Sequence, residues 1–287
     1  MLLASFGFAT MSCIAHGFRG QAPWPAVALA RMAVTPLLMY ALLAMHGIPM
    51  VWFGSRALWW RSLSGTIGLL CNFYALTRLP ITDVVTVLST SPVWVAVILA
   101  TVFRWPMPRG VWIHAALAVV GVYIMHRPSF NADALPLLVI LLGAMVIATT
   151  KVSLSFCGHL HPYAVVAHYS TCATLISLVL CFVVTDPRVG HVNTSLGLWW
   201  WLVPMGLAGT GAQIFMTRAY ARGATAMVAL VSISQIAFAA AYDLVVWGHG
   251  FDLWKAAGVS VIAGAIALSV RANAALRSEQ AALTALE

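Results

Sequence analysis

Charged side chains are scarce in this chain: they make up 8% of its 287 residues, and only seven of them are acidic. A soluble globular domain carries about 25% charged residues and about 45–50% apolar ones. Here the apolar share is 62% and the mean hydropathy is +0.94, more apolar surface than a soluble fold can bury. The composition therefore excludes an ordinary soluble domain and predicts a protein that has a lipid bilayer as its solvent.

Several motifs with known chemistry are also missing. No Gly-x4-Gly-Lys-Ser/Thr loop occurs, so ATP is not expected to drive a reaction. The five cysteines have no Cys-x2-Cys spacing, and His159, His161 and His168 lack a partner that would complete a metal site. The net charge of +8 comes from singly scattered Lys and Arg residues without a basic stripe, which argues against nucleic acid. We therefore expect no cofactor, no metal ion and no nucleic-acid partner.

What the chain has in abundance is long apolar runs. They are about twice the length of a barrel strand and do not alternate in polarity, so we expect helices. The first run has no basic segment before it, which favours a membrane helix over a signal peptide. That run is barely long enough to span, and the sequence leaves open whether residues precede Met1. The ten runs lie at about 1–18, 23–46, 58–78, 81–103, 109–126, 134–156, 162–184, 195–220, 224–247 and 253–271.

The basic residues predict the orientation, because Lys and Arg are enriched in cytoplasmic loops. With a cytoplasmic N-terminus, ten spans also place the C-terminus in the cytoplasm of a multi-pass inner-membrane protein. Nine basic residues then lie inside: Arg56, Arg61, Arg104, Arg109, Lys151, Arg218, Arg222, Arg271 and Arg277. Six lie outside: Arg19, Arg31, Arg78, Arg127, Arg188 and Lys255.

An internal repeat is visible at an offset of about 143 residues, which aligns Gly121 with Gly264 and places 89–92 on 232–235. Small residues on the fifth and tenth runs would let two helices approach closely. Because each half holds an odd number of spans, the second half enters the membrane in the opposite direction, as in many transporters. The predicted fold is an all-α polytopic membrane protein of two inverted five-helix repeats. The repeats span 1–128 and 129–271, and 272–287 forms a cytoplasmic tail, for which a short surface helix is one possible structure.

Two stretches resemble the drug/metabolite transporter superfamily, in its ten-helix EamA-type branch. They are FYALTRLPITDVVTVLSTSPVWVAVILATVF at 73–103 and AYARGATAMVALVSISQIAFAAAYDLVVWG at 219–248. The resemblance extends over essentially the whole chain, but its motifs are degenerate and do not identify a substrate. It implies a basket of helices around a central cavity, with the fourth and ninth helices lining the middle. The Gly-Glu pair that commonly ends those helices is replaced by Arg104-Trp105 and Gly248-His249, so no role of that glutamate is transferred.

The fourth run contains a proline inside an apolar helix. Pro92 cannot donate to the carbonyl group of Leu88, and its ring disturbs the preceding turn. This predicts a kinked, polar segment that faces substrate; the alternative is a kink satisfied by local hydroxyl groups. The candidate substrate-binding residues of this region are Tyr74, Thr86, Ser89, Thr90, Pro92 and Trp94.

The ninth run carries a polar stripe at helical spacing, formed by Ser232, Gln235 and Tyr242. The stripe either binds substrate or joins helices, and the aromatic residues either line a cavity or pack. Asp243 is an acid within the predicted span, which makes it a candidate for proton coupling unless it reaches water at the helix end. Lys151 and Arg31 lie some turns from the middle of their runs, and we expect them to extend to the membrane surface.

The function predicted from these features is secondary transport of a small organic solute, such as an amino acid or a related metabolite, in the direction of export and by alternating access. A membrane-embedded enzyme acting on a lipid-like substrate is the alternative, although the clustered acids that such chemistry generally needs are missing. A receptor would be expected to have larger loops. The expected partners are the solute and the bilayer, and the sequence leaves open a homo-oligomer.

Overall fold

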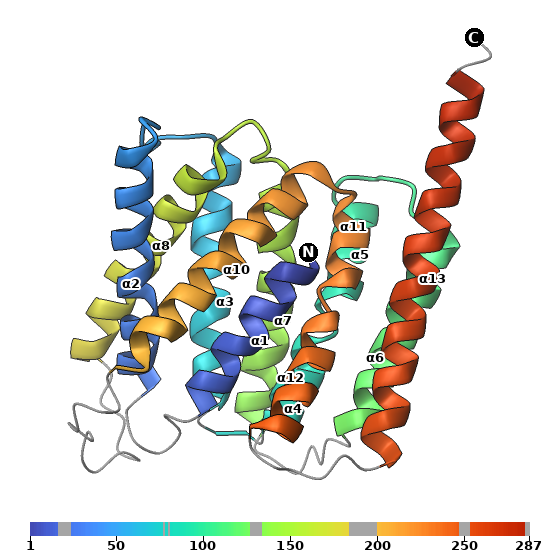
Figure 1. Ribbon diagram of the computed structural model, residues 1–287, viewed down its shortest axis with the longest axis horizontal. Coiled ribbons are helices and arrows are strands. Elements are labelled where there is room, and N and C mark those ends of the chain that lie inside the picture. Colours follow the sequence, from blue (N-terminus) through green and yellow to red (C-terminus); the bar gives the residue numbers. More distant parts are fainter. Residues whose placement is uncertain are drawn as a thin grey trace.

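The computed structural model describes residues 1–16, 24–76, 78–79, 81–126, 134–183, 200–246 and 253–284. This part of the chain forms a bundle of helices that run up and down (Figure 1). The helices of the first half are α1 (Leu2–His16), α2 (Trp24–Met45), α3 (Arg56–Leu76), α4 (Ile81–Leu88), α5 (Ser91–Thr101) and α6 (Arg109–His126). Those of the second half are α7 (Ala134–Ser155), α8 (Pro162–Val183), α10 (Leu202–Arg222), α11 (Thr225–Val231), α12 (Ser234–Val245) and α13 (Leu253–Thr284).

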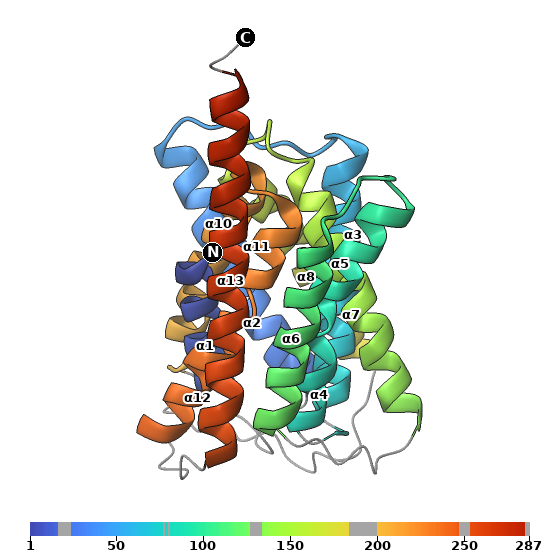
Figure 2. The same ribbon diagram turned by 90° about the vertical axis from the view of Figure 1, so that its right-hand side faces the viewer.

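The helices of one half pack mainly against those of the other. Helix α2 packs against α8 at one end of the bundle, and α6 packs against α13 at the other (Figures 1 and 2). Between these two pairs, α3 contacts α7 and α8, while α10 contacts α1 and α2. Helix α5 contacts α7, and α12 contacts α1. Each of these contacts has a counterpart when the corresponding helices of the two halves are exchanged.

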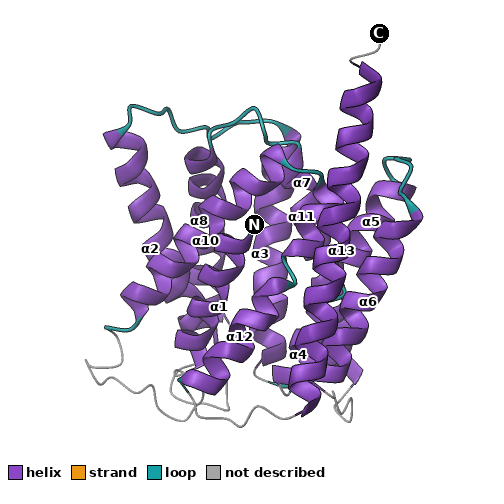
Figure 3. Ribbon diagram, turned by 45° about the vertical axis from the view of Figure 1, so that its right-hand side comes forward, coloured by secondary structure: helices purple, strands orange, loops and turns teal. Residues whose placement is uncertain are grey.

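Every element in the described residues is a helix, as Figure 3 illustrates, so the prediction of an all-α membrane protein is confirmed. Five segments are long and apolar enough to cross a bilayer, and two of them combine a pair of helices, α4 with α5 and α11 with α12. Counting each pair once gives ten helical passes within the described ranges, which agrees with the ten runs of the sequence. Helices α3 and α10 are less apolar because they carry polar residues such as Arg61 and Gln213, which face the centre of the bundle.

The two interrupted passes are broken at equivalent positions. Helix α4 ends one residue before Ser89, and α11 ends one residue before Ser232, at the offset of 143 residues found in the sequence. The Ser89 hydroxyl donates to the carbonyl of Thr86 at 2.6 Å, and the Ser232 hydroxyl donates to the carbonyl of Ala229 at 2.6 Å. Each serine therefore satisfies a carbonyl group that the broken helix frees.

The break near Pro92 agrees with the kink predicted from the sequence, since the proline lies in the first turn of α5. The second break has Gln235 in the corresponding position and needs no proline. The linking residues keep right-handed helical angles, with φ −73° and ψ −11° at Thr90 and φ −65° and ψ −22° at Ile233. The chain therefore continues in the same direction, and each pair of helices crosses the membrane as one pass.

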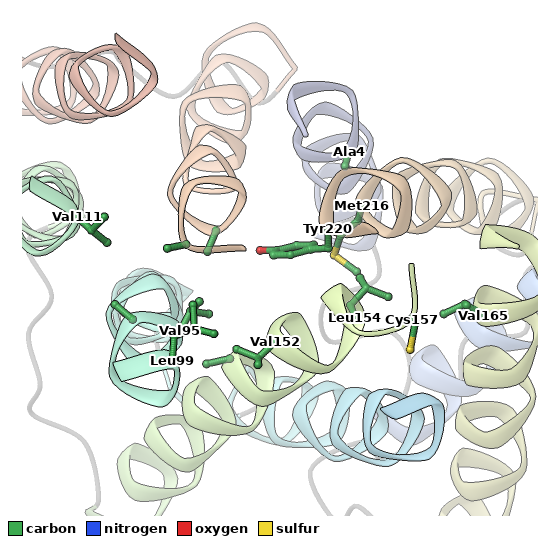
Figure 4. Packing of buried hydrophobic residues seen from close by; sticks show 14 of the residues in the cluster. Ala4, Val95, Leu99, Val111, Val152, Leu154, Cys157, Val165, Met216 and Tyr220 are labelled. Carbon is green, nitrogen blue, oxygen red and sulfur yellow. The ribbon is translucent and has the colours of Figure 1, made fainter. Parts of the chain in front are cut away.

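A buried apolar cluster joins the halves on one side of the bundle. Met216 and Tyr220 of α10 lie beside Leu154 of α7, and Val95 and Leu99 of α5 complete the contact with α7 (Figure 4). In lipid there is no hydrophobic drive between helices, so such contacts stabilise the fold through close packing.

The contact between α6 and α13 confirms the predicted role of small residues on one of the two helices. A Cβ atom added to Gly121 would lie 3.0 Å from the carbonyl oxygen of Gly258 and 2.9 Å from Cγ1 of Ile262. Its repeat-related partner Gly264 has no heavy atom within 4 Å of such a Cβ. The close approach therefore depends on Gly121 and not on Gly264.

The segment after 271 is not a separate surface helix. Helix α13 continues without interruption from Leu253 to Thr284, beyond the level at which the other helices end (Figure 1). The apolar run at its start and the polar segment that follows therefore form one helix of 32 residues.

Candidate solute-binding cavity

A cavity of about 270 Å³ lies between the two halves, surrounded by α1, α2, α3, α7, α8, α10 and the two helix breaks. Both halves supply polar groups to it. The first half provides Ser12, Arg31, Arg61, Asn72, Ser89 and Ser91, and the second provides Thr150, Lys151, Tyr169, Gln213, Ser232 and Gln235. Apolar residues such as Phe8, Leu69, Ile147 and Met216 complete the lining. A site with apolar walls and a few polar groups is typical of small-molecule binding.

Arg61 is held in one orientation by neutral groups. Its side chain is 1% exposed, Nη2 donates to Oε1 of Gln213 at 2.8 Å, and the guanidinium lies 4.1 Å from the centre of the Tyr169 ring. Gly65, one turn further along α3, leaves room for this arrangement, since an added Cβ would clash with Nη1 of Arg61 and lie 2.9 Å from the Tyr169 ring. The stacking and the hydrogen bond fix the planar group before any solute arrives.

Lys151 connects the two helix breaks. Its ammonium group donates to the hydroxyl of Ser91 at 2.8 Å and to that of Ser232 at 3.2 Å, and its side chain is 9% exposed. Ser91 is the first residue of α5, and Ser232 lies between α11 and α12. A single side chain from α7 is therefore bound to both interrupted passes.

Arg31 enters the cavity from α2 and is 7% exposed. Its Nε atom has no hydrogen-bond partner, and the same is true of Nε of Arg61. Gly209 of α10 lies opposite, where an added Cβ would be 3.7 Å from Nε of Arg31 and 3.0 Å from the sulfur of Met11. Arg31 and Gly209 are therefore close neighbours where α1, α2 and α10 meet.

These positions correct three expectations drawn from the sequence. Lys151 and Arg31 do not extend to the membrane surface, and Arg61 does not lie in the cytoplasmic interface, because all three are buried and line the central cavity. The interpretation as surface charges failed because sequence position alone does not indicate toward which neighbour a long side chain points. The signal that could have found them is the polarity of α3 and the isolation of Lys151 within an apolar run.

The predicted binding residues divide into two groups. Ser89, Ser232 and Gln235 line the cavity, at and just after the helix breaks. The others lie elsewhere: Tyr242 shares a hydrogen bond of 2.7 Å with Thr10 of α1, and the Tyr74 ring lies 3.9 Å from the guanidinium of Arg78. Thr90 and Trp94 line a separate apolar hollow, and Thr86 and Pro92 are buried in the pass without reaching the cavity.

Asp243 falls within α12, but its side chain is outside the described part of the structure, so its role in proton coupling stays a prediction. Among the described residues, no group of three His, Cys, Asp or Glu side chains could hold a metal ion. A hydrogen bond of 2.7 Å joins Ser62 and Nδ1 of His168, a combination that can form a nucleophile and its base. Both residues are buried and neither lines the cavity, so this pair has no access to a solute there.

Comparison with known proteins shows a similarity to transporters. Residues 1–127 match the model of the EamA-like transporter family. A curated relative, the pseudopaline exporter CntI of Pseudomonas aeruginosa, is 28% identical over 271 residues, which cover 93% of this chain and 94% of the relative.

The chain is similar to the EamA-like transporter family over its first 127 residues.

Further similarities extend over much of this EamA-like chain. An uncharacterized transporter of Helicobacter pylori is 21% identical over 216 residues, or 73% of the chain and 71% of the relative. A solved crystal structure has a TM-score of 0.80 at 14% identity and covers 93% of this chain and 94% of its own, which supports the fold alone. The resemblance inferred from residues 73–103 and 219–248 is thereby confirmed at the level of the family. The protein is a multi-pass membrane protein that is similar to transporters.

Proposed function

We propose that this protein is a secondary transporter that exports a small organic solute by alternating access. The observation that carries the proposal is the central cavity, which is lined by polar side chains from both halves of the chain. A site shared by two bodies can be exposed on one side of the membrane and then on the other when the bodies move relative to each other. Movement of a single helix pair would not expose the cavity in this way, because the residues that line it come from eight passes.

The two bodies of this proposal are inverted five-helix repeats. The symmetric pattern of helix contacts supports these repeats. The contact of α3 with α7 corresponds to that of α10 with α1, and the contact of α5 with α7 corresponds to that of α12 with α1. The matching breaks at Ser89 and Ser232 provide independent support. With five passes in each half, the second half has the opposite orientation, and the pseudo-twofold axis passes near the cavity.

The helix breaks are the proposed sites of movement. An interrupted helix bends more easily than a continuous one, because fewer backbone hydrogen bonds resist the bend. Lys151 contacts both breaks, so a solute that draws its ammonium group away would weaken the link between α5 and α11. Solute binding and movement of the fourth and ninth passes would thereby be coupled.

The direction of transport and the orientation in the membrane are further parts of the proposal. Export is favoured by the relative named as a pseudopaline exporter. With the buried cavity residues removed from the comparison, seven basic residues lie on the side of both termini and five on the other, which still supports cytoplasmic termini in the inner membrane. The absence of a phosphate loop from the sequence favours a gradient or exchange as the energy source.

The test is counterflow in proteoliposomes, with a panel of labelled amino acids, organic anions, nucleosides and organic cations. We expect saturable, protein-dependent exchange of at least one class, and loss of that exchange when the protein is heat-denatured. If no class is exchanged, with or without a pH gradient, the transporter proposal fails and the membrane-embedded enzyme becomes the better candidate. The Ser62–His168 pair would then be the first site to mutate in a test for enzymatic activity.

A further inference from the structure

The described lining of the cavity carries a positive charge without an acidic partner. Three basic side chains line it, Arg31 from α2, Arg61 from α3 and Lys151 from α7, and each is more than nine-tenths buried. None of the lining residues that the structure describes is acidic. The acids Asp83 and Asp243 belong to α4 and α12, and their side chains lie outside the described residues.

The neighbours of these three groups orient them but do not neutralise them. The oxygen atoms that accept from Arg61 and Lys151 belong to an amide and to two hydroxyl groups, at 2.8–3.2 Å. The Tyr169 ring presents its face to Arg61, with 4.1 Å between the guanidinium carbon and the ring centre. The Nε atoms of both arginines have no partner at all. Each cation therefore keeps donors for a negatively charged group.

Burying a cation without a counter-charge is costly, and inside a membrane such residues generally mark the pathway of a substrate or an ion. Three cations around one cavity of about 270 Å³ repel one another and add to this cost. We infer that the cavity binds a small organic anion that carries two or more carboxylate groups. This inference rests on the proposed transport function, for which it names the class of solute.

The three cations of the cavity favour a solute that carries more than one carboxylate. A monocarboxylate would neutralise one of the three charges, and a zwitterionic amino acid would bring its own ammonium group into the site. A guanidinium group binds a carboxylate through two parallel hydrogen bonds, so Arg31 and Arg61 each suit one carboxylate. Lys151 can exchange its hydroxyl partners for a third anionic oxygen. Organic cations are excluded by repulsion.

The first experiment measures binding separately from transport. The purified protein in detergent is titrated with tricarballylate, butyrate and spermidine, which carry several, one and no carboxylates, and the dissociation constant is measured by calorimetry. We expect tricarballylate to bind at least about 10-fold more tightly than butyrate, because a further charge-assisted hydrogen bond generally contributes that much. Spermidine should not bind. Inorganic phosphate and sulfate are measured in parallel, and tighter binding of either than of tricarballylate would overturn the assignment of carboxylates.

The second experiment removes one charge at a time. Arg31→Gln, Arg61→Gln and Lys151→Gln should each weaken tricarballylate binding by about 10-fold or more. Arg56→Gln is the matched control, because it removes the same charge from an exposed position at the start of α3. Since Arg61→Gln could disturb folding, Arg61→Lys is added; it keeps the charge but loses the paired donors, so it should lie between wild type and Arg61→Gln.

Equal effects of the Arg56 variant and the three cavity variants would overturn the proposal, because binding would then depend on net charge and not on the cavity. Binding of spermidine in preference to tricarballylate would also overturn it and would point to Asp83 or Asp243 as an acidic lining group. Counterflow distinguishes this failure from that of the proposed function. If the protein exchanges a cation or a neutral solute, the transport proposal holds and the anion site is wrong. If it binds tricarballylate tightly but exchanges no solute, the anion site holds and the transport proposal is wrong.

Discussion

The ammonium nitrogen of Lys151 lies 2.8 Å from the hydroxyl oxygen of Ser91 and donates a hydrogen bond to it beside the central cavity. A second hydrogen bond of 3.2 Å extends from the same nitrogen to Ser232. The two serines belong to the breaks of the fourth and ninth passes, which lie in different halves of the chain. One charged group therefore connects the two least regular parts of the backbone, and its removal should affect movement more than stability.

Replacing Lys151 with methionine should abolish most transport without unfolding the protein. Methionine has a similar length but cannot donate to Ser91 or Ser232, and exchanging an unpaired buried charge for an apolar side chain is often neutral or stabilising. We expect counterflow to fall at least about 10-fold while the melting temperature stays the same or rises. Lys255→Met is the control, because this lysine lies outside the cavity at the start of α13. A parallel loss of transport in both variants would contradict the assignment.

A substitution at Gly65 should act on Arg61 without touching its charge. The methyl group of Gly65→Ala would clash with Nη1 of Arg61 and approach the Tyr169 ring to 2.9 Å. Overpacking of this kind costs about 1–3 kcal/mol, and the guanidinium can avoid it only by leaving its contact with Gln213. We therefore expect weaker solute binding, measured by calorimetry, together with a lower melting temperature.

The control for this prediction is Gly211→Ala, since a Cβ at that position of α10 would meet no heavy atom within 4 Å. In a helix interior alanine is favoured over glycine by about 1 kcal/mol, so Gly211→Ala should be neutral or slightly stabilising. If both alanine variants reduce solute binding equally, the effect is not specific to Arg61.

Much of the fold could be predicted because it depends on local features of the sequence. The ten apolar runs predict the ten helical passes of the described residues, and the serines at 89 and 232 mark where two of them are interrupted. The proline explained only one break, since Gln235 occupies its place in the other. Contacts between α3 and α7, or between α10 and α1, join residues far apart in the chain, and no periodicity within a run indicates them.

The site was harder to predict because it depends on which face of each helix points inward. Hydroxyl-rich segments suggested Ser89, Ser232 and Gln235, which do line the cavity. The strongest charges were missed because Arg31, Arg61 and Lys151 each stand alone near one end of an apolar run, where a membrane protein also places its surface cations. The distinction depends on tertiary contacts such as that between Arg61 and Gln213, which are 152 positions apart.

The contact between α6 and α13 should be sensitive at one glycine and tolerant at its repeat-related partner. In Gly121→Leu, the added side chain would press against the carbonyl of Gly258 and the side chain of Ile262. In Gly264→Leu it would enter open space. We expect the first variant to lower the free energy of unfolding by about 1–3 kcal/mol or to prevent folding, and the second to change it little. Thermal unfolding in detergent measures both, and similar losses in the two variants would show that the packing is misplaced.

The orientation of the protein can be tested with single cysteines. Phe53, between α2 and α3, is 95% exposed, and Leu253 at the start of α13 is 82% exposed. If the termini are cytoplasmic, a cysteine at 53 faces the cytoplasm and one at 253 faces the opposite side. In a background without the five native cysteines, a membrane-impermeant maleimide should label Leu253→Cys in intact cells and Phe53→Cys only after lysis. The reverse pattern would invert the proposed topology.

Proton coupling at Asp243 remains to be tested by transport itself. An acid within a membrane pass is costly unless it is paired or hydrated, and it is a candidate for taking up and releasing protons. Asp243→Asn keeps the size and polarity of the side chain but cannot change its charge. We expect the variant to retain exchange of labelled solute across the membrane without a gradient, and to lose the additional uptake that a pH gradient drives.

Exchange and gradient-driven uptake must be measured on the same preparation, because only their ratio separates coupling from a general loss of activity. Asp252→Asn, which the sequence places beyond the end of α12, is the matched control and should keep both activities. If Asp243→Asn loses exchange as well, the residue supports the structure or binds the solute, and it is not the proton-coupling site. If it keeps both activities, coupling resides elsewhere, and Lys151 becomes the next candidate because it is a titratable group already in contact with both moving passes.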